Sequence, residues 1–131
     1  MQILACKKPG ELEYKEEVCN RIKPGHSLLK VKAIGICGTD LHAFEGTQPY
    51  FTYPRVLGHE IAAEILETMD PNFQKGQSVT VLPYFNCGEC VACQKGKGNC
   101  CVSLQVFGVH IDGGMKELIQ VPDSSLIAGE G

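Results

Sequence analysis

Cysteine is the residue whose number and spacing in this sequence point most directly to chemistry. The chain has 131 residues and eight cysteines. Four of these, Cys87, Cys90, Cys93 and Cys101, form the pattern Cys-x-x-Cys-x-x-Cys with a fourth cysteine eight positions later. Three thiolates at three-residue steps can wrap one side of a small cation, and the longer step closes a tetrahedron from the other side. Four sulfurs with no open position predict a structural zinc site.

Other interpretations of this cysteine run agree less well with its spacing. A bacterial ferredoxin run places its fourth cysteine sooner and follows it with proline. A disulfide framework would suit a small secreted protein, but the start of this chain shows no signal-peptide core. Cys100 precedes Cys101 and could substitute for it. Because neighbouring side chains point in different directions, we expect only Cys101 to reach the metal.

A second set of metal-ligand residue types lies earlier in the chain. Cys37 stands in the segment Gly-Ile-Cys-Gly-Thr-Asp-Leu-His (35–42), and His59 and Glu60 follow Gly58. A thiolate, an imidazole and a carboxylate make a three-ligand set that leaves a fourth position for water or substrate, as catalytic zinc sites do. These residues are dispersed, so spacing alone leaves purely structural roles open for them.

The elements that position these residues are expected to be short strands. Turn-forming pairs stand at 9–10 and 24–25, and a further turn is expected at 112–114. No stretch of helical period is long enough for a major helix. Apolar, β-rich runs predict strands at about 3–6, 27–34, 61–66, 78–82 and 115–121. Many short strands at close spacing predict a mainly β domain, either a barrel or a bent sheet.

Two segments depart from the strand pattern, and both carry candidate ligands. Residues 35–60 are rich in glycine, tyrosine, proline and polar side chains, and we expect glycine-flanked turns there. Residues 83–101 form an excursion that is too long for an ordinary hairpin loop and has almost no core-forming pattern. We therefore expect this second segment to be held by its metal rather than by packing.

Composition excludes several classes of function. Hydrophobic residues make up 44% of the chain and charged residues 21%, as in ordinary globular domains. The net charge of −3 gives no electrostatic footprint for nucleic acid, and no basic run favours a membrane surface. No apolar stretch is long enough to cross a bilayer. We therefore expect a cytoplasmic protein with no nucleic-acid or membrane partner.

Three motifs in order along the chain resemble those of a known family. Gly-Ile-Cys-Gly-Thr-Asp-x-His, Gly-His-Glu and Cys-Gly-x-Cys-x-x-Cys, closing at Cys101, resemble the zinc-containing medium-chain dehydrogenase/reductase superfamily, from Gln2 to Pro122. The resemblance implies that residues 1–131 form that family's GroES-like catalytic domain. This domain is a mainly β, partly open β-barrel with a structural-zinc lobe at about 83–101 and few short helices. The branch that the sequence resembles most is that of the sorbitol, threonine and sugar-acid dehydrogenases.

The resemblance also implies a ligand set for a catalytic zinc. Cys37 and His59 would bind it, with Glu60 as the third ligand, as in the polyol branch. In the alcohol dehydrogenase branch the third ligand is a cysteine from further along the chain. Glu60 is therefore either a direct ligand or a carboxylate behind the ligands. Asp40 would orient His59 through the second nitrogen of its ring.

Two further residues would handle the substrate proton, again by resemblance. Thr39 would hydrogen-bond the substrate hydroxyl, and His42 would pass its proton toward solvent. Zinc makes the hydroxyl easier to deprotonate, and hydride then passes from carbon to NAD or NADP. The implied substrate is a small molecule, namely a secondary alcohol, a polyol or a sugar acid.

The nicotinamide-binding part of such an enzyme is expected to lie outside these residues. That part is a Rossmann domain with a glycine fingerprint directly after a strand, which this sequence lacks. We therefore expect a fragment that binds two zinc ions but does not turn over, from a full-length homo-oligomer, a dimer or a tetramer. Two alternatives stay open: a zinc-binding structural or adaptor module, and a redox or iron–sulfur carrier that uses the cysteine lobe.

Several other reactive or aromatic residues have plainer interpretations. We expect His26 to be a solvated turn residue and His110 to lie at a strand end. Cys6 and Cys19 are interpreted as small core or surface residues. Four aromatic residues could line a substrate pocket or could simply pack: Phe44, Tyr50, Phe51 and Tyr53.

Overall fold

The computed structural model describes residues 1–49 and 51–129. Two α-helices are short, α1 (Gly38–Glu45) and α2 (Val91–Gln94), and single 3-10 turns occur at Gly98–Cys100 and Asp123–Ser125. The remaining elements are the strands β1 (Gln2–Lys8), β2 (Glu11–Glu16), β3 (His26–Gly35), β4 (Arg55–Val56), β5 (Glu60–Glu67), β6 (Ser78–Val81), β7 (Tyr84–Phe85), β8 (Gln105–Val106), β9 (Leu118–Pro122) and β10 (Leu126–Ala128). Within the described residues, no helix has the length and apolar character needed to cross a membrane.

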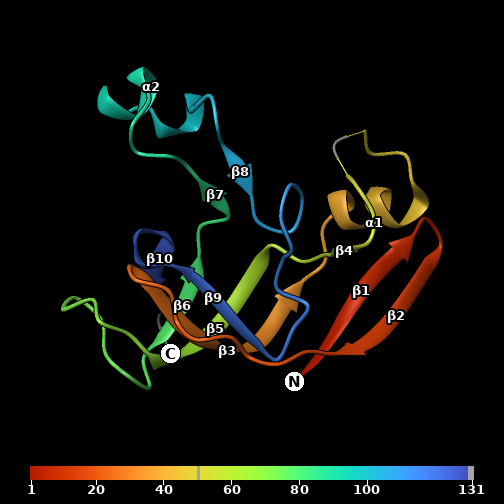
Figure 1. Cartoon of the computed structure of the whole chain (residues 1–131), viewed down its shortest axis with the longest axis horizontal. Helices are drawn as coiled ribbons and strands as arrows, with labels where there is room; N and C mark the ends of the chain where they lie inside the picture. The colour runs from red at the N-terminus through yellow and green to blue at the C-terminus, as the bar shows by residue number, and fades with distance from the viewer. Residues whose placement is uncertain (50, 130–131) are drawn as a thin grey trace.

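A curled five-stranded sheet forms the body of the molecule, with the strand order β10-β6-β5-β3-β9 (Figure 1). A second sheet, β2-β1-β4, lies beside it, and the pair β7-β8 leads out to the lobe that carries α2. The register between β3 and β5 shifts twice, between Leu28 and Leu29 and between Val31 and Ala33. Such bulges bend a strand and increase its twist, which explains why the sheet curls into half a barrel. The prediction of a mainly β, partly open barrel is confirmed.

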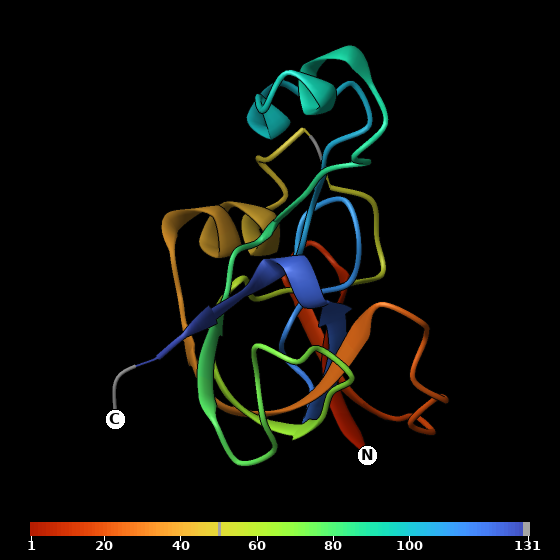
Figure 2. The same cartoon turned by 90° about the vertical axis from the view of Figure 1, so that its left-hand side faces the viewer.

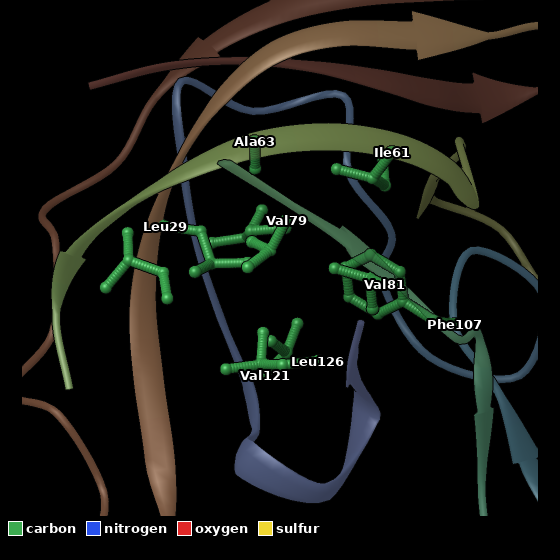
Figure 3. Packing of buried hydrophobic residues seen from close by; sticks show 10 residues of the cluster. Leu29, Ile61, Ala63, Val79, Val81, Phe107, Val121 and Leu126 are labelled. Atoms are coloured by element: carbon green, nitrogen blue, oxygen red, sulfur yellow. The ribbon is translucent and has the colours of Figure 1, made fainter. Parts of the chain in front are cut away.

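The main hydrophobic core fills the inside of this half barrel. Along β5 the burial alternates strictly at first, so that Ile61, Ala63 and Ile65 face inward while their neighbours face out. Figure 3 shows Ile61 and Ala63 pointing into the space that is also filled by side chains from other strands, such as Val79 and Val121. The buried members of this core are Leu29, Ile61, Ala63, Ile65, Val79, Val81, Phe107, Ile119, Val121 and Leu126. A smaller core around Leu57 and Phe51 lies under α1.

The pairing of β3 with β5 sets the geometry of the candidate site. Gly35, the last residue of β3, is the register partner of Glu60, the first residue of β5. Cys37 lies two residues after Gly35, and His59 lies one residue before Glu60. Antiparallel pairing of β3 with β5 therefore brings these two distant segments to the same end of the sheet.

Most of the expected strands are present, and two expectations differ from the structure. Strand β9 begins at Leu118 rather than at residue 115, because the backbone of residues 113–115 bonds to that of residues 56–58 instead. Residues 38–45 form a helix where turns were expected, so that expectation was wrong. The helix buries only Asp40 and Ala43, and so few inward apolar residues give no helical period in the sequence.

Candidate metal centres

The four cysteines of the predicted structural site converge in the lobe. Their sulfur atoms all lie within 4.8 Å of one another. The Sγ–Sγ distance is 3.9 Å between Cys87 and Cys93, 3.5 Å between Cys90 and Cys93, and 3.5 Å between Cys101 and Cys87. Zinc–sulfur bonds of about 2.3 Å in a tetrahedron put neighbouring sulfurs about 3.8 Å apart. The lobe therefore has the dimensions of a closed zinc site with four thiolate ligands.

The lobe also supplies hydrogen-bond donors for negatively charged sulfur. Cys87 Sγ accepts from the backbone N–H groups of Glu89 (3.4 Å) and Cys90 (3.3 Å), and these bonds lower the pKa of Cys87. Cys101 Sγ accepts from the backbone N–H groups of Cys87 and Ser103, both at 3.3 Å. Backbone donors aimed at the sulfurs favour thiolates, which are the form that binds metal.

The pKa values of Cys90 and Cys93 shift in opposite directions. Backbone N–H groups of Cys93 and Val102 lower the pKa of Cys90 to about 6. Burial and the hydrogen bond with Cys90 raise the pKa of Cys93 to about 11. Because metal binds the thiolate form of cysteine, a cation that binds both sulfurs would displace the proton of the Cys93 thiol.

The second candidate metal site includes Cys37, whose position is fixed by the start of helix α1. Cys37 is the N-cap: its Sγ accepts from the backbone N–H of Thr39 at 3.3 Å. In return the carboxylate of Asp40 accepts from the backbone N–H of Cys37 at 3.1 Å. This is a reciprocal capping box with cysteine in the position usually taken by serine or threonine. The cap holds the sulfur at the positive end of the helix.

His59 faces Cys37 with one ring nitrogen and Asp40 with the other. Nε2 of His59 lies 3.2 Å from Cys37 Sγ, close to the roughly 3.6 Å that separates a nitrogen and a sulfur on one tetrahedral zinc. Nδ1 is buried and has no hydrogen-bond partner among the described residues. Asp40 Oδ1 lies 3.7 Å from Nδ1, and its side chain is only 3% exposed.

This unpartnered nitrogen fits a metal site. A cation on Nε2 requires the proton of the neutral ring to sit on Nδ1, and the Asp40 carboxylate lies 3.7 Å from that nitrogen. The positioning role of Asp40 stays a prediction. Cys37, Asp40 and His59 form the second of the two groups whose ligand atoms all lie within 4.8 Å of one another in the described residues.

A glycine-lined contact fixes the loop that carries His59. The backbone carbonyl of Gly58 accepts from the N–H of Gly114 at 2.8 Å. A Cβ on Gly113 would lie 2.2 Å from that same carbonyl oxygen, and one on Gly108 would lie 2.6 Å from it. Only glycine allows the segment 108–114 to pack this closely on Gly58. The sequence analysis interpreted 112–114 as a turn and missed this role; the run Gly113-Gly114 was the available signal.

Glu60 lies apart from the group formed by Cys37, Asp40 and His59. Its carboxylate rests against the backbone of Gly35, since a Cβ there would lie 2.2 Å from Glu60 Oε2. The choice between direct ligand and outer carboxylate is therefore still a prediction. Glu60 and His59 both line an open cleft of about 740 Å³ along the ends of β3, β5 and β6.

The other singled-out residues are spread over the molecule. Phe51 is buried and Tyr53 packs against the same small core, so these two aromatics serve packing, while Tyr50 lies outside the described residues. Phe44 is 36% exposed. His26 begins β3 and is half-buried, and His110 accepts at Nδ1 from the backbone N–H of Val106. Cys6 is fully buried and Cys19 is exposed, as expected of a core and a surface residue.

The structure thus combines a partly open antiparallel barrel with one four-cysteine cluster and one cysteine–histidine pair, which are ligand types that zinc prefers in proteins. The chain belongs to the family described as the alcohol dehydrogenase GroES-like domain, whose family model matches residues 23–130. The resemblance proposed from the three motifs is thereby confirmed.

Individual relatives and solved structures show which members of this family the chain is similar to. The chain is 44% identical over 133 residues to L-galactonate-5-dehydrogenase of Escherichia coli K12, covering 100% of the chain and 39% of the relative. It is 42% identical over 125 residues to an uncharacterized zinc-type alcohol dehydrogenase-like protein of Haemophilus influenzae, covering 93% and 36%. The structure of RspB from E. coli CFT073, described as a short chain alcohol dehydrogenase complexed with cofactor NADH, matches at a TM-score of 0.89 and 36% identity, covering 98% and 38%. The chain thus spans about two fifths of the length of these proteins.

Proposed function

We propose that this chain is the zinc-binding, substrate-activating domain of a longer NAD(P)-dependent dehydrogenase that oxidises a secondary alcohol, polyol or sugar acid. The observation that carries the proposal is the cysteine–histidine pair. Cys37 Sγ and His59 Nε2 lie 3.2 Å apart, and the buried Nδ1 of the same histidine faces Asp40. His59 also lines an open cleft of about 740 Å³.

Zinc held by Cys37 and His59 would supply a Lewis acid that eases deprotonation of a hydroxyl and polarises a carbonyl. The chain's own residues do the rest. Asp40 keeps the His59 ring in the orientation that leaves Nε2 free as a ligand. The cap of α1 keeps Cys37 Sγ beside it. Cys37 and His59 are both attached to the paired ends of β3 and β5, so the two ligand atoms are already close together before a metal binds.

Thr39 and His42 are proposed to handle the substrate proton. They stand three residues apart on α1 and therefore share one face of the helix. Thr39 is half-buried beside Cys37, which suits a residue that contacts the reacting hydroxyl. The side chain of His42 is 59% exposed, which suits a residue that releases the proton to water.

The relatives support a sugar acid as substrate and a separate nicotinamide domain. L-galactonate-5-dehydrogenase acts on a sugar acid, and RspB was solved with NADH. The named strands of the described residues pair only in antiparallel fashion, whereas a Rossmann domain is built on a parallel sheet. We propose that the cofactor, and the main subunit contacts of a homo-oligomer, belong to the remaining part of the protein.

Metal analysis of the purified chain tests the proposal directly. We expect two zinc ions per chain, one lost in Cys37→Ala and the other in Cys87→Ala, with Cys19→Ala as the control that keeps both. A wild-type chain that holds a single zinc, with the same content in Cys37→Ala, would indicate an adaptor module, and iron in place of zinc would indicate a carrier.

Activity assays complete the test. Protein expressed from the complete gene should reduce NAD or NADP with sugar acids or polyols, and Cys37→Ala should abolish this reaction. The 131-residue chain alone should show no turnover. Reduction of NAD by that chain with any of these substrates would contradict the proposed division into two parts.

A further inference from the structure

The turn that ends α1 brings two side chains to the ring of His42. Gly46 follows the helix with a φ of 81°, a left-handed conformation, and its N–H donates to the carbonyl of His42 at 3.0 Å. The backbone N–H of Thr47 donates to the same carbonyl at 3.0 Å. The chain therefore turns back at Gly46, and the side chain of Thr47 lies beside the ring of His42.

Two oxygens lie near the same nitrogen of the His42 ring. Thr47 Oγ1 is 3.2 Å from Nδ1, and Glu45 Oε2 is 3.7 Å from it. Thr47 Oγ1 also lies 3.4 Å from the carbonyl oxygen of His42, to which its hydroxyl donates. With its one proton used there, the hydroxyl can only accept from Nδ1. A carboxylate such as Glu45 accepts in any case.

We propose that Thr47 and Glu45 are positioning residues that hold neutral His42 in the tautomer with its proton on Nδ1. The partner of one ring nitrogen decides which nitrogen keeps the proton. Nε2 is then left with a free lone pair, and no described residue hydrogen-bonds to it. The tautomer makes Nε2 the proton-accepting atom of this side chain.

The inference adds an atom-level route to the proposed function, on which this step rests. A proton from the substrate side, through Thr39 or an intervening water, adds to Nε2 while Nδ1 keeps its own. The resulting imidazolium is stabilised by Glu45 and returns to the neutral form when Nε2 gives that proton to bulk water. One proton enters and one leaves at the same nitrogen, so the ring ends as it began. The opposite tautomer would offer only an N–H at Nε2 and could not start the transfer.

A simple helix-capping role for Thr47 would predict something different. The two side chains of the His42–Glu45 pair are 59% and 61% exposed, so the pair contributes little to the stability of the fold. Thr47 is exposed as well, so loss of its hydroxyl should change the tautomer much more than it changes the stability. The two roles are separable by spectroscopy.

Nitrogen NMR of zinc-loaded chain labelled in histidine tests the inference. The chain has four histidines, so His42→Gln assigns the signals. At a pH where the ring is neutral, we expect His42 to show a protonated Nδ1 and an unprotonated Nε2. Thr47→Ser should keep this state. The double variant Thr47→Val with Glu45→Gln should move most of the population to the Nε2–H form while its melting temperature stays close to that of the wild type. A wild-type His42 that is mainly Nε2–H, or a double variant that does not change, would overturn the proposal.

Kinetics of the full-length enzyme provide the second readout. Thr47→Val with Glu45→Gln should lower kcat several-fold and leave KM nearly unchanged, and Thr47→Ser should restore most of the rate. An unchanged kcat together with a shifted tautomer would overturn the catalytic part. The NMR measurement of the His42 tautomer does not depend on enzyme activity. Failure of the proposed enzyme function would therefore be distinguishable from failure of this inference.

Discussion

Replacing Gly113 by alanine tests whether the packing of residues 108–114 holds His59 in place. A Cβ at this position would lie 2.2 Å from the carbonyl oxygen of Gly58, 2.6 Å from Cα of Gly108 and 2.9 Å from the carbonyl oxygen of Leu57. All three are backbone atoms, so no side-chain rotation can relieve the contact. The loop must move about 1.2 Å to reach the 3.4 Å of an ordinary van der Waals contact.

The expected cost follows from the bonds that this movement stretches. Three backbone N–H groups of residues 113–115 donate to the carbonyls of residues 56–58, at 2.8 to 3.0 Å. At a net value of about 1 kcal/mol for each hydrogen bond, their loss lowers the free energy of unfolding by about 3 kcal/mol. Strain from an added methyl group in a packed site falls in the same range, about 1–3 kcal/mol.

Urea unfolding of the zinc-loaded chain measures this change, and cobalt substitution reports on the metal site. Gly113→Ala should lower the unfolding midpoint and weaken the thiolate–cobalt absorption that Cys37 contributes, because His59 moves with Gly58. Gly38→Ala is the matched control: nothing lies within 4 Å of its added Cβ, and it stands in a helix, where alanine is favoured. A Gly113→Ala variant within about 0.5 kcal/mol of the wild type would refute the steric argument.

Four other predictions concern the lobe and the smaller core. Asn86 Nδ2 donates to Cys93 Sγ at 3.5 Å, so Asn86→Ala should speed zinc release from the lobe about fivefold, the equivalent of one hydrogen bond. Gly98→Ala should also speed zinc release, since its added Cβ would displace the Asn86 side-chain amide. The effects of the two substitutions on the release rate should not add in the double variant, and stopped-flow competition with a chelator measures this rate. Burial raises the pKa of the Cys6 thiol above its ordinary value of 9.0, so the neutral thiol stabilises the fold below about pH 9, and this stability is lost as the pH rises through the raised pKa. Cys6→Ala should therefore flatten the decline of stability above about pH 9. Tyr53→Phe removes the hydrogen bond from the phenol to the carbonyl of residue 43 and should cost about 1 kcal/mol in thermal unfolding, whereas no change would mean that water replaces the bond.

The four-cysteine lobe is the part of the structure that sequence reasoning reached most directly. All its ligands lie between residues 87 and 101, and the steps between them limit how the backbone can run. With so few residues between ligands, little besides a small cation can satisfy four converging thiolates. Neither α2 nor the 3-10 turn at Gly98–Cys100 buries a residue, and Figure 2 shows the lobe projecting away from the sheets, so long-range packing does not override the local pattern.

The second site was harder to predict because its parts are distant in sequence. Cys37 and His59 are 22 residues apart, and their 3.2 Å approach depends on the register of β3 with β5. The helix that begins after Cys37 gave no signal, since cysteine is not among the usual N-cap residues and the helix has almost no apolar face. Cys37 and His59 were predicted as ligands of one metal from the resemblance of the motifs to a known family, because the spacing of the two residues in the sequence was not sufficient.

The sequence by itself determined which residues could bind a cation and which strands would alternate between core and solvent. Both depend on short-range periodicity and on donor chemistry, which are properties of neighbouring residues. Only the tertiary structure decided that His59 turns Nε2 toward Cys37 and Nδ1 toward Asp40, and that Glu60 rests on Gly35. Those orientations arise from strand register and from the close backbone contact of residues 108–114 with Gly58. Such contacts join segments tens of residues apart, and no local pattern encodes them.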